Sequence, residues 1–213
     1  MAKGLSRSVI VDAALAVLDD DGIDGVTVRA VAQRLDVKAP ALYWHVAGKQ
    51  ELLDEMGTEI QRRVIQELVA RLDEKADWRE GLTTYARVLR EEYLAHRDGA
   101  RTFSGTRLTD PEVLRAQEPW LQRWVDQGLS IQDATDAATL VTSFVVGFVI
   151  EEQERAQGGQ QRYSLSERDA NVGPDAPLVH ESGRIIYDDP SARFERLVNV
   201  LLDGLAATMR SGA

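Results

Sequence analysis

Three ring-bearing residues in succession, Tyr43, Trp44 and His45, follow Pro40 in a short stretch of the sequence. Tyrosine and histidine can donate hydrogen bonds to phosphates or base edges, while proline and tryptophan offer apolar contact to a thymine methyl group. A short helix cannot bury all three rings, and exposed rings indicate a binding surface. We expect Tyr43 and His45 at the surface and Leu42 in the core, with Trp44 in either place.

Three cations accompany this stretch. Arg29 can form a bidentate contact with guanine, and Lys38 and Lys49 flank the rings where backbone phosphates would lie. The alternative is that the rings only fill the core of a small domain. The predicted DNA contacts are Arg29, Lys38, Pro40, Tyr43, Trp44, His45 and Lys49.

The predicted helices around these residues form a small N-terminal DNA-binding unit, which we call the head. Hydrophobic spacing and cap residues predict a helix from Ser6 to about Asp20, ended by Gly22, and a second helix that starts after Thr27. A turn at residues 36–37 leads to a third helix, 40–45. Two short helices joined by a tight turn and supported by a longer one are the geometry of a helix-turn-helix.

The rest of the chain is also predicted to be helical, which makes the fold all-α. The N-terminal three-helix head would occupy residues 1–49, a connecting helix residues 50–69, and a C-terminal effector-binding and dimerisation domain residues 70–213. A mobile loop with room for one short helix is predicted between Gln157 and Pro190. The other predicted helices run from Gln50 to Val69, Asp77 to His96, Asp110 to Gly128, Ser130 to Ile150 and Ala192 to Met209, with a loop or short helix between Gly99 and Gly105.

Composition limits the possible functions. The net charge is −10, although residues 1–65 hold 8 Lys and Arg against 10 Asp and Glu, so the head is near neutral and would need a dimer to bind DNA. The absence of cysteine excludes disulfides and thiolate zinc sites. We expect no membrane-spanning segment, no signal peptide and a cytoplasmic protein.

The segment Val26 to Lys49, VTVRAVAQRLDVKAPALYWHVAGK, resembles the head of the tetracycline repressor (TetR) family. The run LYWHV is closest to the tetracycline repressor subgroup, and the resemblance continues through HRDGA (96–100), GTR (105–107) and EEQE (151–154). It implies a ligand-responsive repressor that binds a palindromic operator as a homodimer, with DNA contacts from the predicted residues other than Lys38. Ala39 and Ala41 replace the subgroup's glutamine and threonine, so we expect a different operator.

The resemblance also implies an effector site in the C-terminal domain. In the subgroup, a histidine just before Gly-Thr-Arg coordinates magnesium held with the drug, and Phe103 stands at that position here. A phenyl ring cannot coordinate a cation, so we expect no metal and no cofactor, and a largely apolar effector. Thr106 and Arg107 are the preferred contacts, because the others also suit plain packing. The predicted effector contacts are Tyr85, Leu89, Phe103, Thr106, Arg107, Trp120, Phe144, Phe148 and Glu151.

The two most apolar helices, 134–150 and 192–209, are predicted to pair with their copies in a four-helix dimer interface. An enzyme is not expected, because His45, His96 and His180 form no His pair at helical spacing and accompany no nucleophile pattern. The alternative function is a helical small-molecule-binding or interaction protein without DNA binding. The same head also suits an activator.

Overall fold

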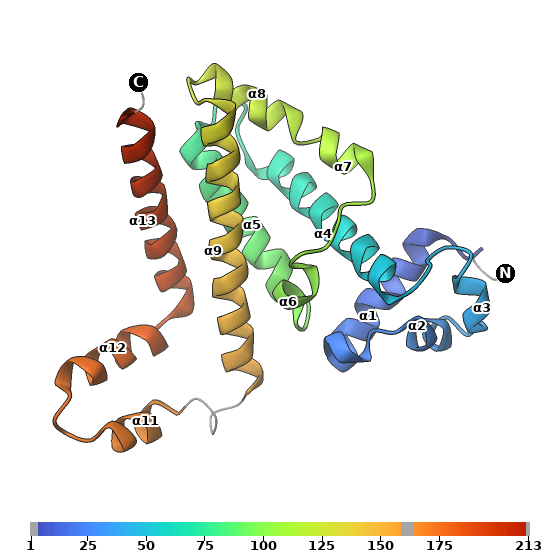
Figure 1. Ribbon diagram of the computed structural model, residues 1–213, viewed down its shortest axis with the longest axis horizontal. Helices are drawn as coiled ribbons and strands as arrows, with labels where there is room; N and C mark the ends of the chain where they lie inside the picture. Colours follow the sequence, from blue (N-terminus) through green and yellow to red (C-terminus); the bar gives the residue numbers. More distant parts are fainter. Residues whose placement is uncertain (1–3, 159–163, 212–213) are drawn as a thin grey trace. The chain divides into compact units, whose positions relative to one another are not determined.

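A computed structural model describes residues 4–158 and 164–211, and it contains helices but no strand within those ranges. This confirms the predicted all-α fold. The chain divides into two compact units, Met1–Val146 and Gly147–Ala213, so the boundary falls inside one long helix. The helices of Figure 1 are α1 (Arg7–Gly25), α2 (Val28–Arg34), α3 (Ala39–Leu42), α4 (Lys49–Arg71), α5 (Trp78–Leu94), α6 (Gly99–Phe103), α7 (Pro111–Arg115), α8 (Glu118–Asp126), α9 (Ile131–Gln157), α11 (Leu165–Val172), α12 (Pro177–Tyr187) and α13 (Pro190–Ser211).

Helix starts agree with the cap residues read from the sequence. The side chains of Ser6, Thr27, Asp77 and Ser130 each accept a hydrogen bond from the backbone N–H three residues further on. Such a bond satisfies one of the donors that the first turn of a helix leaves free. Gly22, predicted to end the first helix, has a positive φ of 74° and interrupts α1, which then continues to Gly25.

The third helix is shorter than predicted. It begins at Ala39 and ends at Leu42, so Tyr43, Trp44 and His45 lie in the turn that follows. The N–H of His45 bonds to the Leu42 carbonyl only three residues back, at 2.8 Å, which is the tighter pattern of a helix end.

Two other predictions are corrected. The single helix predicted from Asp110 to Gly128 is two helices, α7 and α8, and Pro119 at the start of α8 has no N–H to continue the first helix. The loop predicted between Gln157 and Pro190 contains two helices, α11 and α12. Its polar composition hid the cap at Ser164 and the helix start at Pro177. Residues 159–163 of that stretch lie outside the described residues.

The core of the first unit is organised around α4. This helix contacts α1 of the head and also α5, α6 and α7 of the body. Figure 1 shows α4 leading from the head helices into the body. The apolar residues that the sequence pattern placed inward on α4, including Leu52, Met56, Ile60 and Val64, are at most 1% exposed. One helix therefore holds both the head and the body.

By length and composition alone, α9 is apolar enough to cross a membrane. One third of its most apolar window is buried inside the structure. The core helix of a soluble protein meets the same criterion, so this feature does not place the chain in a membrane.

The second unit packs around aromatic rings. Phe148 on α9 and Phe194 on α13 meet edge to face with centroids 5.2 Å apart, and the Arg193 guanidinium lies 4.9 Å from the Phe148 ring centre. These contacts join the end of α9 to the start of α13 within this unit.

Candidate functional site

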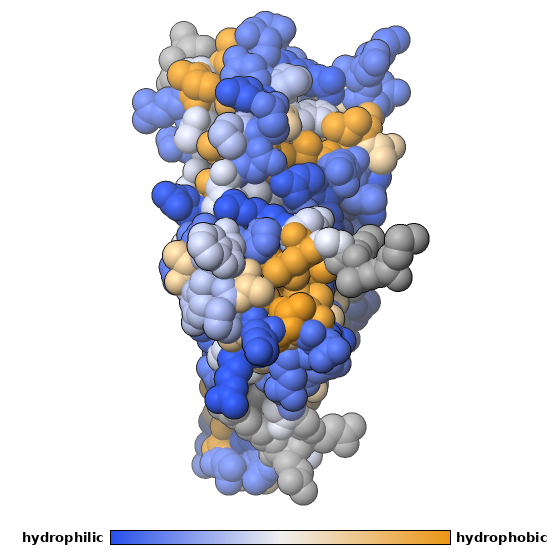
Figure 2. Space-filling model, turned by 90° about the vertical axis from the view of Figure 1, so that its right-hand side faces the viewer, coloured by the Kyte–Doolittle hydropathy of each residue, from blue (hydrophilic) through white to orange (hydrophobic). Residues whose placement is uncertain are grey.

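The head exposes two of the three rings. Trp44 is 90% exposed and Tyr43 57%, whereas Leu42 is fully buried. His45 is half-buried. The expectations for Tyr43 and Leu42 are confirmed, Trp44 takes the surface alternative, and His45 is less exposed than predicted. Figure 2 shows hydrophobic patches surrounded by hydrophilic residues on the side that faces the viewer.

The predicted cations also lie on the surface of the head. Arg29 at the start of α2 and Lys38 before α3 are exposed, and so is Pro40. The Lys49 ammonium donates a hydrogen bond to the carbonyl of Ile23, 3.0 Å away, near the C-terminal end of α1. A phosphate that contacts Lys49 would therefore share this ammonium with the end of a helix, where cations are favoured.

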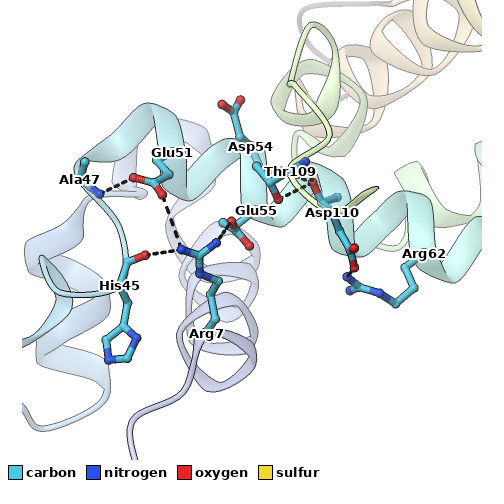
Figure 3. Close-up of polar contacts among 10 residues, drawn as sticks. Arg7, His45, Ala47, Glu51, Asp54, Glu55, Arg62, Thr109 and Asp110 are labelled. Carbon is cyan, nitrogen blue, oxygen red and sulfur yellow. Dashed lines mark hydrogen bonds and ion pairs between the residues drawn. The ribbon is translucent and has the colours of Figure 1, made fainter. Parts of the chain in front are cut away.

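An arginine that the sequence reading did not single out positions the rings. Arg7 on α1 donates to the carboxylate of Glu55 at 2.6 Å and to the backbone carbonyl of His45 at 3.2 Å (Figure 3). The neighbouring Glu51 accepts from the N–H of Ala47 at 2.6 Å. These contacts tie the turn after α3 to the first turns of α4. No local pattern reveals the contacts of Arg7, because Arg7 lies far in sequence from its three partners, His45, Glu51 and Glu55.

The HRDGA segment holds the other end of α1. Nδ1 of His96 lies 3.0 Å from the carboxylate of Asp19, and the N–H of Arg97 donates to the same carboxylate. Asp98, in the left-handed region at φ 56°, accepts from the N–H of Ile23 at 3.1 Å. Residues 96–98 therefore join the body to the head at a second place.

The loop between α6 and α7 lies against α4. The Thr58 hydroxyl, buried on α4, accepts from the N–H of Thr109 at 2.9 Å and donates to the carbonyl of Asp54. The N–H of Arg107 donates to the Asp54 carboxylate at 3.1 Å. At the end of this loop, the Arg62 guanidinium of α4 contacts Asp110 at 2.9 Å (Figure 3). That ion pair and the N–H of Glu112 lower the pKa of Asp110, the N–H having the larger effect.

The first unit contains a cavity of about 540 Å³ between α4, α5, α8 and α9. Trp120 and Trp124 contribute aromatic surface, and Tyr85 and Thr142 contribute hydroxyl groups that lie 2.9 Å apart. Burial raises the pKa of Tyr85, so the phenol keeps its proton at neutral pH. The lining consists of Gln61, Ile65, Leu68, Leu72, Gly81, Tyr85, Leu108, Gln117, Trp120, Leu121, Trp124, Thr135, Ala138, Thr139, Thr142 and Ser143, none of which is charged.

Two of the predicted effector contacts, Tyr85 and Trp120, line this cavity. Leu89 is buried outside the lining, and Phe144 is half-buried and also outside it. Phe148 belongs to the second unit, as does Glu151, which pairs with Arg155 at 3.4 Å.

Thr106 and Arg107, the preferred polar candidates, lie in the loop between α6 and α7. The Thr106 hydroxyl donates to the carbonyl of Phe103 at 2.9 Å and rests on Gly57 of α4, while Arg107 is exposed. Neither residue lines the cavity. Instead, both belong to the loop that packs on α4.

The polar residues in the cavity lining were not among the predicted effector contacts. Gln61 and Gln117 come from α4 and from the residue before α8, and Thr135, Thr139 and Thr142 come from α9. The threonine spacing of four and three residues is that of one helix face and was the available signal. The threonine spacing was not recognised because the rest of this segment of α9 is strongly apolar.

The structure does not fit a metal at the position where the subgroup has its histidine. Phe103 is buried, and its ring lies 6.0 Å from that of Tyr93 and 5.9 Å from that of His96. Its side chain offers no ligand atom. Among the residues described, no group of three or more histidine, aspartate or glutamate side chains is arranged to hold a metal.

A helical head with outward rings, joined by one helix to a body that contains an uncharged cavity, defines a ligand-binding regulator of the helix-turn-helix class. Family models confirm both parts: "Bacterial regulatory proteins, tetR family" matches residues 10–56, and "Tetracyclin repressor-like, C-terminal domain" matches residues 72–209. The chain belongs to the TetR family of ligand-responsive DNA-binding repressors.

Individual relatives agree over nearly the whole length. Tetracycline repressor protein class A of Escherichia coli is 36% identical over 204 residues, which cover 95% of this chain and 91% of the relative. A possible TetR family regulator of Streptomyces coelicolor A3(2) is 35% identical with a TM-score of 0.82, covering 95% of this chain and 100% of the other. ActR of Streptomyces coelicolor, solved in complex with actinorhodin, is 30% identical with a TM-score of 0.82 over the full length of both chains. The named relatives are regulators rather than enzymes.

Proposed function

We propose that this protein is a cytoplasmic, homodimeric repressor that binds a palindromic DNA operator and is released by a small, uncharged, largely apolar effector. The observation that carries the proposal is the double role of α4. Near its start, Glu55 is bonded to Arg7 of the head, and further along, Gln61, Ile65 and Leu68 line the cavity. A ligand in the cavity therefore touches the helix that positions the head.

The proposed DNA contacts are the seven residues predicted from the sequence, and the exposed rings of Tyr43 and Trp44 support them. The proposed domain division is also that of the sequence reading, with the head in 1–49, the connection in 50–69 and the effector and dimerisation domain in 70–213. A dimer supplies two heads to one site, which compensates for the near-neutral charge of each head.

Release requires the effector to favour one arrangement of α4 over another. A ligand shifts an equilibrium between two states only by its difference in affinity for them. In this proposal the loop between α6 and α7 couples the ligand to α4, because Leu108 of the loop lines the cavity and the N–H of Thr109 donates to Thr58 of α4. Tetracycline repressor and ActR, both named with small molecules, support a small-molecule effector for this chain.

A gel shift with palindromic DNA from the promoter region tests the proposal. The logarithm of the binding constant should fall linearly with the logarithm of salt concentration, because each phosphate contact releases counterions. The near-neutral charge of the head favours a second candidate, a small-molecule-binding protein without DNA binding. The absence of a salt-dependent shift with any such fragment would support that candidate.

A further inference from the structure

Three threonines of α9 that line the cavity have already used their only hydroxyl proton. The Oγ1 atoms of Thr135, Thr139 and Thr142 lie 2.7, 2.8 and 2.8 Å from the carbonyl oxygens four residues earlier. A carbonyl can only accept, so each threonine is the donor in its own contact. What remains on each hydroxyl oxygen is acceptor capacity alone.

The hydroxyl proton of Thr142 also fixes the direction of its contact with Tyr85. The hydroxyl of Tyr85 on α5 lies 2.9 Å from Oγ1 of Thr142, and either atom is a possible donor by geometry. Because the Thr142 proton goes to the carbonyl of Ala138, Tyr85 must be the donor. Its phenol is protonated at neutral pH, since burial raises its pKa. Beyond this bond, Tyr85 also offers only lone pairs.

The amide donors in the lining come from other elements. Gln61 belongs to α4 and Gln117 immediately precedes α8, and each carries a side-chain amide that can both donate and accept. No charged side chain contributes to the lining, so an ionised ligand would lose its hydration without gaining a partner. The indole rings of Trp120 and Trp124 favour a flat aromatic molecule.

We propose that the cavity selects a neutral, flat aromatic ligand that directs hydroxyl or N–H donors toward the threonine face of α9 and Tyr85. The inference rests on the proposed function, because it assumes that this cavity is the effector site. It adds a rule of hydrogen-bond direction: ligand acceptors that face Tyr85 and the three threonines of α9 meet acceptors there and leave them unpaired.

Isothermal titration calorimetry on the full-length protein tests the rule with three matched probes. We expect 2,6-dihydroxynaphthalene to bind most tightly, 2,6-dimethoxynaphthalene about 2- to 10-fold more weakly, and the anionic naphthalene-2,6-dicarboxylate not measurably. Equal affinity of the first two probes, tighter binding of the dicarboxylate, or no binding of any probe would overturn the inference.

Matched variants assign the preference to α9. Thr139→Val should weaken binding of the dihydroxy probe by about 2- to 10-fold and leave the dimethoxy probe unaffected. Thr83→Val is the control, because Thr83 makes the same bond to the carbonyl four residues earlier, at 2.8 Å, and does not line the cavity. Equal effects of the two variants would overturn the assignment.

A gel shift run with the same probes separates the two proposals. If the dihydroxy probe is preferred but no DNA fragment binds the protein, the ligand rule stands and the proposed repressor function fails. If both naphthalenes bind equally and release DNA, the repressor function stands and the ligand rule fails.

Discussion

Gly57 of α4 and Thr106 of the loop between α6 and α7 are so close that a methyl group on Gly57 would lie 2.2 Å from the Thr106 hydroxyl oxygen. This hydroxyl is also bonded to the carbonyl of Phe103, so it is not free to turn away. The contact places the loop directly on the helix that lines the cavity and positions the head.

Gly57→Ala should therefore destabilise the protein. Overpacking of a close contact costs about 1–3 kcal/mol, and the better helix propensity of alanine returns up to about 1 kcal/mol. Urea unfolding should show a net loss of about 1 kcal/mol. Thr106→Ala removes the nearest atom, so adding it to Gly57→Ala should recover part of the loss. A net gain in stability for Gly57→Ala would contradict the contact.

Tyr43→Ala should weaken operator binding by about 5- to 150-fold, the loss expected when a specific contact of about 1–3 kcal/mol is removed. Because Tyr43 is 57% exposed, its free energy of unfolding should change by less than about 0.5 kcal/mol, and the dimer should persist. Gel shift and urea unfolding measure the two effects. Val69→Ala is the control, since Val69 is 64% exposed on α4 outside the head. Unchanged DNA affinity would remove Tyr43 from the contacts.

Arg7→Ala should loosen the turn after α3. The change leaves the buried carboxylate of Glu55 and the carbonyl of His45 without this donor. A buried polar group that loses its partner lowers the free energy of unfolding by about 1–3 kcal/mol. Because the Arg7 side chain is about half exposed, we expect a loss near the lower end of that range. Glu55→Gln combined with Arg7→Ala should cost less than the sum of the single changes. Additive effects in urea unfolding would show that the two side chains do not interact.

The hairpin of α11 and α12 should be more stable in weak acid. Nε2 of His180 lies 2.7 Å from the carbonyl of Gly173, and Nδ1 lies 3.2 Å from Asp169. The bond to the Gly173 carbonyl has the largest effect and raises the pKa of His180, and the contact with Asp169 raises it further. Desolvation and the charge of Arg184 lower it by less. Arg168 also faces this cluster through its own bond to Asp169.

The sign follows from the raised pKa. The stabilisation is fully present below the unfolded pKa of about 6.5 and is lost as the pH rises through the higher folded value. Amide protection factors for residues 165–187, corrected for intrinsic exchange, should be larger at pH 6 than at pH 8. His180→Gln should remove this difference. Protection that increases with pH in the unaltered protein would refute the prediction.

Val200→Asp should convert the dimer to a monomer. Val200 is an apolar residue that is 62% exposed on the amphipathic helix α13, and a carboxylate in a buried interface is costly. Light scattering should give about twice the 23.6 kDa chain mass for the unaltered protein and the single mass for the variant. Leu114→Asp is the control, because Leu114 is 52% exposed on α7. A monomeric unaltered protein would contradict the proposed assembly.

The sequence was most informative where short-range interactions decide the structure. Ser6, Thr27 and Asp77 cap helices through bonds to residues three positions away, so their roles are visible in the local pattern. It was less informative at Pro119, where a helix that looked continuous divides into two. There the hydrophobic residues keep a helical spacing, although proline lacks the backbone N–H that a continuous helix would need.

By itself, the sequence determined the helical class, the caps, the inward side of α4 and the small head with its rings at residues 43–45. These features depend on helix propensity and on the helical period of about 3.6 residues, and both are visible in a short stretch of sequence. Tertiary structure decided that Arg7 holds the His45 carbonyl, that Thr106 rests on Gly57, and that hydroxyl groups line the cavity beside Trp120. Such contacts join residues far apart in the chain, and their geometry exists only after the helices have packed.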